Sequence, residues 1–125
     1  MANSNDTTTG KPVEVSNVIK ADVNFTVIKG DTFDVILIFY DASGQPVSFA
    51  GATLLMMIRD FNDVEVETLQ AGSEFVVSGN TLTFNYIPNY GPDTFYYDLQ
   101  CTFSSGLRKT LIGGKFKVLK QITTL

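Results

Sequence analysis

Histidine and tryptophan are absent from this sequence of 125 residues, and cysteine occurs only once. The lack of histidine removes the usual general base at neutral pH, the common serine and cysteine triads, and most transition-metal sites. We therefore expect no enzyme activity, no metal and no cofactor. Cys101 cannot form an internal disulfide, and its place in a strand-like run predicts a small buried apolar side chain.

Charged side chains are also scarce: they make up 18% of the sequence and leave a formal net charge of -4. A weakly acidic surface attracts a phosphate backbone poorly, so we expect no nucleic-acid partner. The longest apolar runs, Val35–Tyr40 and Leu54–Ile58, are far shorter than the roughly 20 residues of a membrane-spanning helix. The polar start of the chain lacks the apolar block of a signal peptide. We therefore expect neither a membrane partner nor secretion by that route.

What the sequence does contain is a regular series of short β-rich runs separated by turn residues, which predicts an all-β fold of hairpins. Thr94–Ser104 shows the clearest period of two. Its core phase comprises Phe95, Tyr97, Leu99, Cys101 and Phe103. No stretch of ten residues has a helical apolar stripe with caps. The fold class that follows is an antiparallel, immunoglobulin-like β-sandwich with an extended N-terminal arm.

The composition changes along the chain and divides it into three parts. These are a polar N-terminal arm (1–20), the sandwich (21–120) and a short C-terminal tail (121–125). A polar terminal segment is typical of a flexible tail, but a few aliphatic residues favour the alternative of a docking arm that orders on a partner. Those residues are Val13, Val15, Val18 and Ile19.

Two predicted strands are apolar on both faces, Phe33–Tyr40 and Thr53–Ile58. Either a loop or the arm covers their outer faces, or the faces form a protein interface. The interface alternative uses Ile36, Ile38, Leu55 and Met57. It includes a homodimer formed through the two isoleucines.

Several short patterns suggest ligands without completing a known site. Asp60–Glu65 lacks the glycine and the helices of a calcium loop, and Gly113–Lys115 lacks the full spacing of a phosphate loop. Most aspartates lie in or beside turns, where the side chain bonds nearby backbone groups. A dense aromatic group comprises Tyr86, Tyr90, Phe95, Tyr96 and Tyr97. Core packing is the favoured role for this group, and a ligand-stacking platform is the alternative.

Turn and strand motifs spread over residues 22 to 119 resemble an immunoglobulin-like domain of phage structural proteins. The best-known relative is the N-terminal domain of baseplate upper proteins. The motifs are Ile28–Phe33, Phe39–Val47, Gly51–Leu54, Ile58–Asp60, Tyr96–Gln100, Ser105–Leu111 and Gly114–Val118. They appear in the same order as in that family.

This resemblance implies a virion protein that is made in the bacterial host cytoplasm and acts as a protein–protein attachment module. The expected partners are other virion proteins, and a homo-oligomer, for example a dimer, is expected. A capsid accessory protein, a head-fibre component and a baseplate or tail adaptor all fit this role. The alternative is a carbohydrate-binding or adhesin-like sandwich that uses the aromatic residues between Tyr86 and Tyr97.

Overall fold

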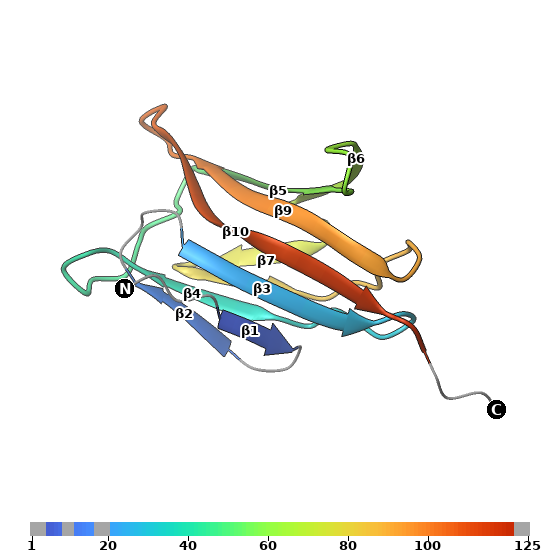
Figure 1. Ribbon diagram of the computed structural model, residues 1–125. Helices are drawn as coiled ribbons and strands as arrows, with labels where there is room; N and C mark the ends of the chain where they lie inside the picture. Colours follow the sequence, from blue (N-terminus) through green and yellow to red (C-terminus); the bar gives the residue numbers. More distant parts are fainter. Residues whose placement is uncertain (1–4, 9–11, 17–20, 122–125) are drawn as a thin grey trace.

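The computed structural model describes residues 5–8, 12–16 and 21–121, and every regular element among them is a strand (Figure 1). The strands are β1 (Asn5–Thr8), β2 (Pro12–Ser16), β3 (Ala21–Ile28), β4 (Ile36–Tyr40), β5 (Thr53–Arg59), β6 (Glu65–Gln70), β7 (Phe75–Ser78), β8 (Thr81–Phe84), β9 (Asp93–Thr102) and β10 (Arg108–Leu119). They form a six-stranded sheet in the order β1-β3-β10-β9-β5-β6 and a four-stranded sheet in the order β2-β4-β8-β7. The protein is therefore an all-β sandwich.

The predicted immunoglobulin-like sandwich is confirmed, but the sheets are not wholly antiparallel. The three hairpins β5–β6, β7–β8 and β9–β10 are antiparallel, as short connections require. In contrast, β3 pairs in parallel with both β1 and β10, and β2 pairs in parallel with β4. Between β3 and β10 the chain crosses to the four-stranded sheet and returns twice, and such long connections permit parallel pairing.

The N-terminal residues contribute an edge strand to each sheet. β1 lies beside β3 in the larger sheet, and β2 lies beside β4 in the smaller one (Figure 1). Within β2, Val13 pairs with Leu37 and Val15 pairs with Phe39. The other two residues of the predicted docking arm, Val18 and Ile19, lie outside the described residues.

The segment Pro46–Phe49 lies between β4 and β5 and forms no strand. Only Pro46 makes a bridge, to Tyr40, because this part of the chain crosses from one sheet to the other. The turn before it is held by Asp41, whose carboxylate accepts hydrogen bonds from the Ser43 hydroxyl and the Gln45 backbone N–H. These bonds lower the pKa of Asp41. This aspartate has the turn role that the sequence predicts for its class.

The core lies between the two sheets and is rich in phenylalanine. Its largest fully buried side chains are Phe25, Phe33, Phe39, Phe75, Phe84, Phe116, Leu37, Leu54, Met56, Ile58, Leu69 and Leu82. The predicted core phase of β9 is correct: Phe95, Tyr97, Leu99 and Cys101 are buried, and Phe103, just beyond the strand, is half-buried. Burial raises the pKa of the Cys101 thiol to about 11, so it is protonated at neutral pH, as a packing role requires.

A tyrosine and a glycine join the two parallel strands at the centre of the larger sheet. Gly114 in β10 faces Tyr97 in β9, and the Tyr97 hydroxyl donates a 2.6 Å hydrogen bond to the Val23 carbonyl oxygen in β3. Beside it, the Lys115 backbone N–H donates to Asn24 Oδ1 at 2.9 Å. The ring of Tyr97 thus reaches β3 from a strand two places away because the strand between them carries no side chain at Gly114.

None of the described residues forms a helix long and apolar enough to cross a membrane.

Candidate functional site

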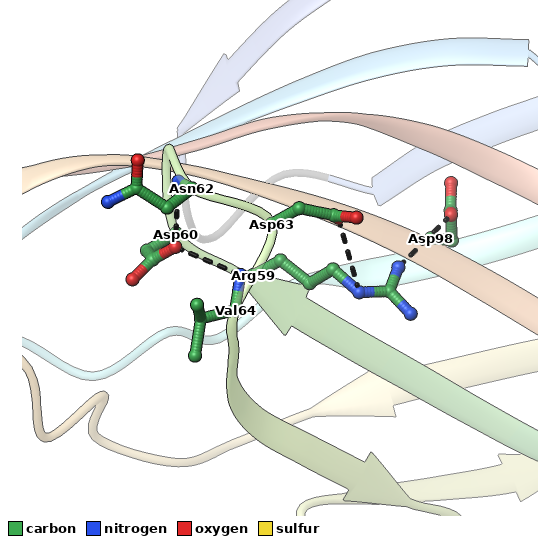
Figure 2. A network of polar contacts seen from close by, with 6 residues as sticks. All are labelled: Arg59, Asp60, Asn62, Asp63, Val64 and Asp98. Atoms are coloured by element: carbon green, nitrogen blue, oxygen red, sulfur yellow. Dashed lines mark hydrogen bonds and ion pairs between the residues drawn. The ribbon is translucent and has the colours of Figure 1, made fainter.

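The turn between β5 and β6 is rigid, because one aspartate side chain organises it (Figure 2). Asp60 Oδ1 accepts hydrogen bonds from the backbone N–H of Asn62 at 2.8 Å and of Val64 at 3.0 Å. The Asp60 backbone closes the same turn through bonds with Val64 and Asp63. Asp63 adopts a φ of 62°, a left-handed conformation that aspartate tolerates better than most residues. The turn therefore holds its side chains in fixed directions.

This rigid hairpin exposes apolar side chains to solvent. Phe61 is 80% exposed and Val64 is 57% exposed, and Val66 on β6 is also exposed. β6 is an edge strand of the larger sheet, and β1 and β2 lie on the opposite flank of the molecule (Figure 1). A large aromatic side chain that contacts water on a well-ordered turn is a feature of protein-binding surfaces.

Replacing Asp60 with alanine is expected to lower the free energy of unfolding by about 1 to 2 kcal/mol, because two backbone N–H groups lose a charged acceptor. Urea unfolding measures this loss, and amide hydrogen exchange at Asn62 and Val64 is expected to accelerate. Asp60→Asn keeps an acceptor oxygen and is the matched control, with a smaller expected loss. Equal stability of the alanine variant and the wild type would show that the turn is held by other contacts.

On the other side of the same turn, Arg59 lies between two carboxylates. Its Nε is 3.5 Å from Asp63 Oδ1, and its Nη1 is 4.0 Å from Asp98 Oδ2 on β9. Figure 2 shows Asp63 and Asp98 on either side of the guanidinium group, whereas Asn62 and Val64 point away from it. We call the part of the hairpin that carries Arg59 and Asp63 its charged side.

The charged side borders a hollow of about 440 Å³ on the outer face of the larger sheet. The lining comprises Asp22 and Asn24 of β3, Arg59 of β5, Asp63 of the turn, Tyr96, Tyr97 and Asp98 of β9, and Gly114 and Lys115 of β10. Four strands, β3, β5, β9 and β10, therefore meet the β5–β6 turn at one place. Of these residues, Tyr96 and Tyr97 belong to the aromatic group for which the sequence offered ligand stacking as an alternative, whereas no binding role was predicted for Phe61.

The four core-strand residues predicted for an interface lie on two different surfaces. Ile36 and Ile38 alternate with buried residues of β4, so they lie on the outer face of the four-stranded sheet. Leu55 and Met57 alternate with buried residues of β5 and lie on the outer face of the six-stranded sheet. All four are half-buried by their neighbours. The structure therefore does not bring them together into one interface.

The aromatic group between residues 86 and 97 is mostly internal. The hydroxyls of Tyr86 and Tyr90 lie 3.0 Å apart, and burial raises the pKa of both. Glu67 is close to them, and burial raises its pKa too, while one of its carboxylate oxygens has no hydrogen-bond partner. Only Tyr96 presents a substantial part of its ring, 40% exposed, on the outer face of the sheet.

No group of three or more histidine, cysteine, aspartate or glutamate side chains in the described part of the chain is arranged to hold a metal ion.

Comparison with known proteins gives a weak structural likeness and no family. No family model matches the sequence, and no curated protein matches it. Among solved structures, the chain is similar to CopC from Methylosinus trichosporium OB3b, with 16% sequence identity and a TM-score of 0.39. The likeness covers 62% of this chain and 76% of the CopC chain. At this identity and TM-score the likeness carries no argument about the fold or the function of this chain.

Proposed function

We propose that this protein is an attachment module of a phage particle and binds another virion protein through the β5–β6 hairpin. The observation that carries the proposal is the exposure of Phe61, 80% of which contacts solvent on a turn fixed by hydrogen bonds. A Phe side chain that leaves water on binding contributes apolar area at the centre of an interface. Because the turn is already ordered, binding loses little conformational entropy there.

The edge strand supports the same role. β6 pairs with β5 on one side, and no other described strand pairs with its outer edge. An unpaired edge presents backbone N–H and C=O groups to which a partner strand can add. Val64 and Val66 flank this edge, so strand addition would bury them together with Phe61. The phage setting rests on the likeness of the turn and strand motifs over residues 22 to 119.

The Phe61→Ala substitution tests the proposed interface. We expect about 2 kcal/mol of binding free energy to be lost, which is about thirtyfold in affinity, because a buried aromatic anchor is removed. Particles from a phage whose gene for this protein carries a stop codon are mixed with the purified protein and sedimented. Quantitative immunoblotting of the pellet over a range of protein concentrations then gives the apparent Kd.

Val76→Ala is the matched control, because Val76 is an exposed apolar residue on β7 of the other sheet. We expect it to bind the particles like the wild type. If the Val76 variant loses binding and the Phe61 variant binds fully, the interface lies on the four-stranded sheet and not on the β5–β6 hairpin. If the wild-type protein does not sediment with the particles at all, the attachment function is wrong.

A further inference from the structure

The floor of the hollow beside Arg59 is organised in two rows, each of which crosses three neighbouring strands. In one row, Asp22 of β3 pairs with Gly113 of β10, which pairs with Asp98 of β9. In the next row, Lys115 of β10 pairs with Tyr96, which pairs with Arg59. Because the residue between the two aspartates is a glycine, no side chain fills the space between their carboxylates. The floor is therefore open along its centre, with polar groups on both sides.

The charges around this floor largely balance. Three carboxylates line the hollow, from Asp22, Asp63 and Asp98, and two cations line it, from Arg59 and Lys115. Arg59 already lies between two of the carboxylates. Among the described residues, no ion pair engages Lys115 or Asp22. The hollow thus offers hydrogen-bond donors and acceptors together, without a strong net field that would select an ion of one sign.

An aromatic ring completes the lining. Tyr96 is 40% exposed, and its ring borders the hollow between Lys115 and Arg59. Tyrosine in such a position offers a flat apolar surface next to polar groups. The volume of about 440 Å³ falls within the usual range of small-ligand sites, about 300 to 1,000 Å³.

We propose that this hollow binds a neutral saccharide. The apolar face of one sugar ring stacks on Tyr96, and its hydroxyl groups, which both donate and accept, bond the Asp98 carboxylate and the Lys115 ammonium group. A hydroxyl-rich neutral ligand matches the balanced charges, the mixture of donors and acceptors and the single exposed ring. This site lies on the charged side of the β5–β6 turn, so it extends the protein's role beyond attachment through Phe61.

The test is an NMR titration of the intact ¹⁵N-labelled protein with glucose, galactose, N-acetylglucosamine and rhamnose as separate probes. We expect at least one of them to shift the amide signals of strands β3, β9 and β10 around Asn24, Tyr96 and Lys115, with a Kd on the order of 1 mM because a single sugar offers few contact atoms. Tyr96→Ala is expected to weaken this binding about tenfold. Tyr96→Phe is expected to retain most of it, because the ring remains.

Gln100→Ala is the matched control, since Gln100 is exposed on the same face of β9 and does not line the hollow. It is expected to bind the sugar like the wild type. The proposal fails if none of the four sugars shifts these amide signals at a sugar concentration about 50 times the expected Kd of about 1 mM. It fails as well if the Tyr96→Ala variant binds the sugar as tightly as the Gln100→Ala variant. It also fails if only arginine hydrochloride, added as a separate probe, produces the shifts, which would assign the hollow to a basic side chain of a protein partner.

The two proposals fail separately. Phe61→Ala is expected to bind the sugar normally, and Tyr96→Ala is expected to sediment with the particles normally, because Tyr96 lines the hollow and Phe61 does not.

Discussion

Replacing Phe33 with alanine is expected to lower the free energy of unfolding by about 3 to 5 kcal/mol, the range for a large aromatic side chain removed from a core. Phe33 is fully buried, although it lies in a connection between the sheets and not within a strand. Its ring centroid is 4.9 Å from that of Phe116, 5.2 Å from that of Phe25 and 5.6 Å from that of Phe84. It thus contacts rings from both sheets, and its loss leaves a cavity that neither sheet alone can close.

Urea unfolding followed by circular dichroism measures this effect, and the midpoint is expected to fall while the slope stays the same. Phe33→Leu is the control, because leucine refills most of the space without the edge-to-face ring contacts. Its loss is expected to be clearly smaller than that of the alanine variant. If the Phe33→Ala variant loses less than about 1 kcal/mol of unfolding free energy, the two sheets close the cavity and the prediction is wrong.

The Gly114→Ala substitution is expected to cost about 2 to 3 kcal/mol, as overpacking a filled site does. A Cβ atom at this position would lie 2.5 Å from the Val23 carbonyl oxygen and 2.7 Å from Asn24 Oδ1. The first of these atoms is backbone and accepts the hydrogen bond of Tyr97, so it cannot move away without breaking that bond. The added methyl group therefore pushes β3 and β10 apart.

Gly91→Ala is the control for this experiment, because a Cβ atom at Gly91 meets no other atom within 4 Å. It is expected to change stability by less than about 0.5 kcal/mol, as surface substitutions usually do. In the Gly114 variant, amide exchange at Lys115 is expected to accelerate, because its N–H bond to Asn24 is disturbed. Unchanged exchange and full stability would contradict the close packing of the two strands.

The local parts of this fold could be predicted from the sequence. The alternation in β9 identified its buried face, since a strand places successive side chains on opposite faces. The hairpins were likewise apparent from turn residues between short apolar runs. The parallel pairing of β3 with β10 could not be predicted, because its partners are 91 residues apart, as Ala21 and Ile112 show, and no local pattern records which strands meet. The strand β1 was also missed, since it is short and two of its four residues, Asn5 and Asp6, belong to types that are rare in strands.

The candidate sites were harder to predict than the fold. Phe61 lies inside a turn that we examined for calcium binding, and nothing in its neighbours shows that its ring contacts solvent. The hollow depends on four strands and a turn, so only the tertiary structure brings Asp22, Arg59 and Lys115 together. The prediction that Ile36, Ile38, Leu55 and Met57 share an interface treated two apolar strands as neighbours. They belong to opposite layers, with the core between them.

The parallel pairing of β3 and β10 also determines how the protein responds to mechanical force. Tension applied between the start of β3 at Ala21 and the end of β10 at Leu119 pulls the two strands lengthwise in opposite directions. The hydrogen bonds between them are then loaded together in shear, whereas a hairpin pulled from its open end separates one bond at a time. A sandwich held by these two strands resists stretching until the whole ladder breaks.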